Sequence, residues 1–104
     1  MAKRRDKIPF DAVVCYNDQI AIQVLKGLEE ENIACPGEVA VTGYDNSYLA
    51  STCRIPLTTI AHPQERLGEM AAELLLKLIR SESVPKEECN IQIEPELVIR
   101  ESTD

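Results

Sequence analysis

The sequence predicts an α/β fold, in which a parallel sheet is flanked by helices. Two compact apolar runs, residues 12–16 and 38–42, are separated by a segment whose apolar residues recur with helical spacing. A strand, a helix and a second strand in this order form a right-handed parallel unit. Each run is followed by a tyrosine and polar residues, and ligands bind at the carboxyl ends of strands in open α/β sheets. The chain of 104 residues suits one domain or part of one.

The first strand is a continuous apolar run, which is typical of a parallel strand covered on both faces. A helix is expected from residue 18 to about residue 31, because its apolar residues form a single stripe. The stripe consists of Ile20, Val24, Leu25 and Leu28. Ile22 falls off this stripe, and an isoleucine exposed there is either a subunit contact or an ordinary surface residue.

The second strand, residues 38–42, leads into a turn and then into a short helical turn at residues 46–51. The apolar side of this helical turn consists of Leu49, Ala50 and Cys53. The β-branched segment 57–60 lies between two prolines. It is therefore expected to be a short, isolated strand of the kind that suits a hinge.

The longest helix is predicted from residue 63 or 64 to about residue 80, with a strongly apolar face. That face consists of Leu67, Met70, Ala71, Leu74, Leu75 and Leu78. Residues 81–90 are expected to be a polar linker, and residues 91–93 and 97–99 are expected to be short strands. The final residues, 101–104, are expected to be a frayed end.

Composition argues against several functions. A net charge of −7 is unfavourable for direct binding to nucleic acid, which requires a basic face. The basic cluster Lys3-Arg4-Arg5 is either a DNA-reading arm or, as we prefer, a helix end or chain terminus. Residues 1–11 lack the apolar core of a signal peptide. No apolar run approaches the ~20 residues of a membrane helix, so no membrane partner is expected.

Catalysis and metal binding also find little support. The four cysteines are scattered and form no C-x-x-C pair, so reduced structural thiols are favoured over disulfides or a zinc site. The glycines form no phosphate-binding loop, and no cofactor is expected. His62 is the single histidine, and no nucleophile motif accompanies it. We therefore do not expect an enzyme.

Binding explains the two strand ends better. Asn17 offers an amide donor and acceptor and Asp45 a carboxylate acceptor, which suits the adjacent hydroxyls of polyols and sugars. Tyr16 and Tyr44 either wall such a site with their rings or pack within the loops. Helix capping is the alternative role for Asn17 and Asp18; we favour capping for Asp18 and ligand contact for Asn17. Asp45 could be an ordinary turn residue, but its place after a strand favours ligand contact.

A series of motifs stands in order along the chain. They are DAVVCYNDQIAI at residues 11–22, VAVTGYDNS at 39–47, PLTTI at 56–60, GEMAAELLL at 68–76 and PELVIREST at 95–103. Together they resemble the lactose/galactose-repressor (LacI/GalR) family of regulators, in the C-terminal part of its periplasmic-binding-protein type I effector domain. The resemblance covers residues 8–103, with residues 1–7 and 104 as tails. The CYND and HPQE stretches look most like the arabinose repressors, which carry a GntR-type DNA-binding domain.

The resemblance implies the sugar-sensing and dimerisation portion of a cytoplasmic bacterial repressor of carbohydrate metabolism. By resemblance, Asn17 and Asp45 line the effector cleft, and residues 57–60 cross the hinge between two lobes. The residues that would face a partner subunit, in a homodimer or higher oligomer, are Ile22, Leu49 and Cys53. Asn46 stands where the family often has a second aspartate.

The resemblance also implies that one lobe and the DNA-binding domain are absent from this chain. Operator DNA would be bound only through that absent domain, and the chain alone would bind sugar weakly or not at all. The apolar face of the longest helix, which would pack on the other lobe, is expected to be buried against the remaining strands or another chain. The alternative function is an extracytoplasmic sugar-binding protein of the same fold for transport.

Overall fold

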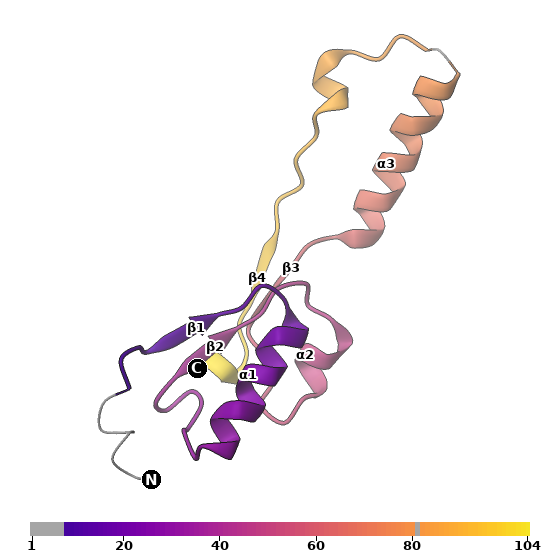
Figure 1. Cartoon of the computed structure of the whole chain (residues 1–104). Helices are drawn as coiled ribbons and strands as arrows, with labels where there is room; N and C mark the ends of the chain where they lie inside the picture. Colours follow the sequence, from indigo (N-terminus) through magenta and orange to yellow (C-terminus); the bar gives the residue numbers. More distant parts are fainter. Residues whose placement is uncertain (1–7, 81) are drawn as a thin grey trace. The chain divides into compact units, whose positions relative to one another are not determined.

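The computed structural model describes residues 8–80 and 82–104, and Figure 1 shows the course of the chain. The basic cluster Lys3-Arg4-Arg5 lies outside the described residues. The chain forms two compact units. The first contains the described residues up to Ala61 together with Glu96–Asp104, and the second contains His62–Pro95. None of the helices in the described ranges combines the length and apolarity that spanning a bilayer requires.

The first unit begins with the predicted strand–helix–strand order, β1 (Ala12–Val14), α1 (Asp18–Glu30) and β2 (Ala40–Thr42). The two strands are parallel, with Ala12 opposite Ala40 and Val14 opposite Thr42. The prediction that β1 is covered on both faces is wrong, because Val14 is 83% exposed. A single helical layer from this chain leaves the other face of the strand open.

Helix α1 packs through a slightly different stripe from the predicted one. Ala21 and Leu25 are buried, whereas Ile20 is 46% exposed. At the start of the helix, the residue on the buried side is therefore Ala21 rather than the predicted Ile20. Ile22, expected to be exposed, is half-buried. The helix ends where Asn32 adopts a positive φ of 57°, a conformation that asparagine tolerates.

The chain continues through α2 (Tyr48–Thr52) into β3 (Thr59–Ala61), and β4 (Glu96–Val98) lies antiparallel beside β3. Thr58 forms a parallel bridge with Thr42, so the segment before β3 lies beside β2. Leu57 is fully buried, and it joins a core made of Cys15, Ala21, Leu25, Val39, Val41, Ala50 and Leu57. The expectation of an isolated strand is therefore wrong, since this segment extends the parallel arrangement.

The last residues are firmly held, and the expectation of a frayed end is wrong. Ser102 is fully buried within a 3-10 helix, Glu101–Thr103. Its hydroxyl donates to the carbonyl oxygen of Val41 at 2.6 Å and accepts from the backbone N–H of Thr58 at 2.8 Å. A serine in a polar tail gives no sequence signal for this role, because its partners lie in distant strands.

The second unit contains α3 (Gln64–Ile79) and a 3-10 helix, Lys86–Cys89, within the expected linker. Residues 91–95 form no strand, contrary to expectation. None of the residues of α3 is buried, although its apolar residues Met70 and Leu74 are half-buried beside the returning segment. Within its own unit this face is therefore only partly covered. Its burial against the remaining strands or against another chain stays a prediction.

Candidate ligand-binding site

The two turns that follow β1 and β2 meet at one edge of the sheet. The strands are parallel and in register, so their carboxyl ends lie together. The N–H of Cys15 donates to the carbonyl oxygen of Thr42 at 2.9 Å, and the N–H of Asp18 donates to that of Tyr44 at 3.0 Å. These bonds continue the pairing beyond both strands and fix the polar residues of one turn beside those of the other.

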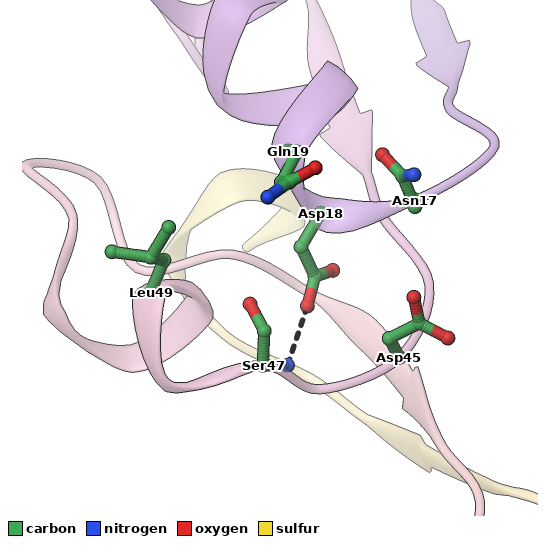
Figure 2. A pocket seen from close by; sticks show the side chains of 6 residues that line it. All are labelled: Asn17, Asp18, Gln19, Asp45, Ser47 and Leu49. Atoms are coloured by element: carbon green, nitrogen blue, oxygen red, sulfur yellow. Dashed lines mark hydrogen bonds between the residues drawn. The ribbon is translucent and has the colours of Figure 1, made fainter.

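The predicted ligand residues line two hollows in this region. Asn17 and Asp45 line one hollow of about 350 Å³ together with Tyr16 and Tyr44. They also line a second hollow of about 260 Å³, shown in Figure 2, with Asp18 and other residues of α1 and α2. Tyr16 is 84% exposed and Tyr44 is 40% exposed. The structure thus brings together the polar and aromatic residues that the sequence singled out.

Asn17 rather than Asp18 caps helix α1, so the capping role that we favoured for Asp18 is wrong, whereas ligand contact at Asn17 stays a prediction. The Asn17 side-chain oxygen accepts the backbone N–H of Ile20 at 2.9 Å, so Asn17 is the N-cap of α1. Its amide nitrogen remains a potential donor at the edge of the hollow. Asp18 does not cap the helix and is only 1% exposed. Sequence alone does not separate these roles, because both residue types cap helices well.

The Asp45 turn has an unusual backbone. Asp45 has a φ of 108° and Asn46 a φ of 51°, values that side-chain-bearing residues seldom adopt. Successive N–H groups hold this conformation. That of Asp45 donates to the carbonyl oxygen of Ile60 at 2.9 Å, and that of Asn46 donates to the Thr59 hydroxyl at 3.2 Å. Strained backbone of this kind persists where the surroundings fix it, and it is frequent in ligand sites.

A buried carboxylate completes the support of the turn. One oxygen of Asp18 accepts the N–H of Ser47 at 2.7 Å, as Figure 2 shows, and the other accepts the Thr59 hydroxyl at 2.7 Å. Thr59 is fully buried and also accepts from Asn46. Each group is thus satisfied, as burial of polar atoms requires. The sequence did not identify Thr59, since a threonine in a β-branched run also fits a strand.

Gly43 permits this arrangement by lacking a side chain. A Cβ at this position would collide with the Asp18 carboxylate and lie 2.8 Å from a methyl carbon of Leu57. The backbone N–H of Gly43 donates to the carbonyl oxygen of Thr58 at 2.9 Å. Close packing between β2, α1 and the segment before β3 therefore requires a residue without a side chain at Gly43.

The cysteines near the site carry free thiols. Burial raises the pKa of the Cys15 thiol above its ordinary value of 9.0. The thiolate is the nucleophilic form, so a raised pKa disfavours covalent chemistry at this residue. Among the described residues, no group of His, Cys, Asp and Glu side chains could hold a metal ion.

The predicted subunit-contact residues are brought together only in part. Ile22 and Leu49 line a common surface hollow with residues of α1. Cys53 does not line it. Its thiol points toward the carbonyl oxygen of Ile55, at 3.1 Å, and the side chain packs against the core. The surface at Ile22 and Leu49 therefore remains the predicted contact, and Cys53 contributes to packing in this chain.

Comparison with known proteins identifies the family to which this fold belongs. Residues 1–103 match the family of periplasmic binding protein-like domains, and the chain belongs to this family. Similar solved structures include LacI-type regulators. One, from Alkaliphilus metalliredigens in complex with D-xylulofuranose, has a TM-score of 0.83 and 32% identity, over 100% of this chain and 39% of that one. The lac repressor dimer bound to operator and an anti-inducer has a TM-score of 0.82 and 28% identity, over 96% and 29%.

Curated relatives are transcriptional repressors rather than enzymes. The arabinose metabolism transcriptional repressor of Geobacillus stearothermophilus is 38% identical over 88% of this chain and 25% of its own length. The repressor PurR of Vibrio parahaemolyticus is 42% identical over 86% of this chain and 26% of its length. The chain thus spans about a quarter of the length of these relatives. The resemblance to LacI/GalR regulators and the predicted α/β fold class are confirmed.

Proposed function

We propose that this chain is the effector-sensing part of a bacterial transcriptional repressor of carbohydrate metabolism, and that Asn17 and Asp45 contact a sugar. The observation that carries the proposal is that both side chains line the same hollow at the carboxyl ends of two parallel strands. The names of its relatives support a regulator. They favour it over a transport protein, and finding a DNA-binding segment in the complete gene product would separate the two.

The residue types of the hollow suit a sugar. The Asp45 carboxylate can accept hydrogen bonds from neighbouring hydroxyls, and the Asn17 amide nitrogen can donate to a ring or hydroxyl oxygen. The rings of Tyr16 and Tyr44, which line the same hollow, offer apolar faces to the C–H side of a sugar. Because backbone hydrogen bonds hold the Asp45 turn, the position from which its side chain extends into the hollow is fixed.

In the regulator we propose, sugar binding changes affinity for operator DNA through a population shift between conformations. DNA is bound by a domain outside this chain, and the protein acts in the cytoplasm as a dimer. The surface at Ile22 and Leu49 is the proposed subunit contact. The lac repressor, which is similar in structure, is a dimer bound to operator, and this supports the assembly.

The test uses calorimetric titration of the complete gene product with arabinose, xylulose and cellobiose, sugars named for similar proteins. Asp45→Asn keeps the shape of the side chain and tolerates the positive φ, but removes the charge. Hydrogen bonds to charged groups contribute about 1.5–3 kcal/mol, so affinity should fall about tenfold or more.

Two further variants serve as controls. Asp11→Asn makes the same chemical change at an exposed position before β1, at the other end of the strand, and should leave affinity unchanged. Asn17→Ser keeps a capping oxygen while removing the amide, so it should weaken binding with little loss of stability. Sugar affinity that is equal in Asp45→Asn and in the unaltered protein would refute the assignment of Asp45.

A further inference from the structure

Arg100 connects the end of the chain to the Asp45 turn. It follows β4 and is half-buried. One guanidinium nitrogen, Nη1, donates to the carbonyl oxygen of Leu57 at 3.0 Å, and the other, Nη2, donates to the side-chain oxygen of Asn46 at 2.8 Å. The planar guanidinium therefore joins a core segment and a turn residue in a fixed geometry.

The backbone of Arg100 is anchored as well. Its N–H donates to the Thr58 hydroxyl at 2.8 Å, and its carbonyl oxygen lies 3.1 Å from the same hydroxyl. Thr58 is buried, and its own N–H donates to Ser102. The backbone of Arg100 is therefore held by partly buried hydrogen bonds to a buried threonine, so the guanidinium extends to Asn46 from an anchored segment.

Asn46 links Arg100 to the candidate site, because its side chain accepts the Arg100 hydrogen bond and it directly follows Asp45. Its φ of 51° follows the φ of 108° at Asp45, so the orientation of the two residues is coupled along the backbone. The contacts of Asp45 and Asn46 with Ile60 and Thr59 hold the N–H groups of the turn. The contact with Arg100 holds a side chain of the same turn from another segment. Without it, the turn would lose a restraint next to the Asp45 carboxylate.

We infer that Arg100 is a positioning residue for ligand binding, acting through Asn46 on the orientation of the Asp45 carboxylate. The inference rests on the proposed function, because it takes Asp45 as a sugar contact. It also gives a role to the segment by which the chain returns to the first unit at Glu96. That segment carries the guanidinium that restrains the turn.

The experiment measures sugar affinity and thermal stability in the complete gene product, with arabinose, xylulose and cellobiose as probes. Asn46→Gly accepts the positive φ and removes the contact with Nη2 while leaving that with Leu57. Arg100→Lys keeps the charge but loses the planar fork. Each variant should weaken sugar binding about five- to tenfold, where tenfold is about 1.4 kcal/mol.

A rescue and a double variant separate positioning from simple stability. Asn46→Asp offers a carboxylate to the guanidinium, so it should retain the affinity of the unaltered protein. Combining Asn46→Gly with Arg100→Lys should weaken binding no further than either change alone, because both break the same link. Thermal stability should be lower in the double variant than in Asn46→Gly alone, since Arg100→Lys also disturbs the contact with Leu57. The amide resonance of Asp45 should shift in both single variants.

The outcomes are distinct. Unchanged sugar affinity in Asn46→Gly and Arg100→Lys, with affinity lost in Asp45→Asn, would overturn the role of Arg100 and leave the proposed function intact. Additive losses of affinity in the double variant would also overturn it, because the two residues would then act separately. Unchanged affinity in Asp45→Asn would refute the assignment of Asp45 in the proposed function, and the role of Arg100 with it.

Discussion

The two units of this chain differ in how much apolar surface they bury and in how many buried polar groups they hold with hydrogen bonds. The first buries an aliphatic core and a set of polar groups, including Asp18, Thr59 and Ser102, each with hydrogen-bond partners. The second contains one long helix and a returning segment, and none of its described residues is buried. The first unit therefore carries the features of a domain interior, and the second presents apolar surface.

Helices α1 and α3 make this difference concrete. Both have apolar residues at helical spacing, and both are amphipathic. Helix α1 buries Ala21 and Leu25 against β2 and α2, whereas Leu75 of α3 is 57% exposed. An amphipathic pattern thus shows that a helix face is suited to burial. Whether the face is buried depends on another element that packs against it.

Substitution of a matched pair of leucines should give the largest contrast between the units. Leu57→Ala removes a fully buried side chain and should lower the free energy of unfolding by about 2–5 kcal/mol. Leu75→Ala, in the exposed helix, should change it by less than about 0.5 kcal/mol. Urea unfolding followed by circular dichroism measures both. Equal losses in the two variants would show that Leu75 is covered in solution, for example by a second chain.

Two glycines should respond in opposite directions to the same change. Gly43→Ala forces a methyl group against Asp18 and Leu57 and should destabilise the chain by about 1–3 kcal/mol. Gly68→Ala, in α3, meets no atom within 4 Å and should stabilise the helix by about 0.5–1 kcal/mol. Thermal unfolding of the two variants checks the signs, and a stable Gly43→Ala protein would contradict the close packing at this turn.

The anchored C-terminal residues offer a third comparison. Ser102→Ala leaves the Thr58 N–H and the Val41 carbonyl oxygen without their partner, at a cost of about 1–3 kcal/mol. Ser83→Ala, at an exposed position in the second unit, should have no measurable effect. Hydrogen exchange at the Thr58 amide provides a local readout. Protection that survives in Ser102→Ala would contradict the bond drawn from this amide.

The thiols should show the smallest effect. Burial raises the pKa values of Cys15, Cys35 and Cys53 above 9.0, whereas Cys89 is exposed. Alkylation at pH 8 should therefore label Cys89 first, as mass spectrometry would detect. A raised pKa in the folded state means that the unfolded chain releases these protons first. The stability linked to the buried thiols is complete below pH 9.0 and falls as pH rises through the folded-state pKa values.

Part of the candidate site could be predicted because its signals are local. An apolar run that ends in a turn, followed by helical spacing, predicts a strand–helix–strand unit, and parallel strands bring Asn17 and Asp45 to one edge. That Asn17 rather than Asp18 caps helix α1 was not predictable. Both can cap a helix, and the choice was decided by the Thr59 hydroxyl, which is far along the chain.

The sequence by itself determined the α/β class, the positions of the main helices and the turn that carries Asp45, because spacing and turn chemistry act over a few residues. Only the tertiary structure decided which polar residues are buried and hold distant segments together through hydrogen bonds. Asp18 meets Thr59 and Ser102 meets Val41 across separations of 41 and 61 residues. A buried polar atom needs a partner, and only the assembled fold determines which distant group provides it.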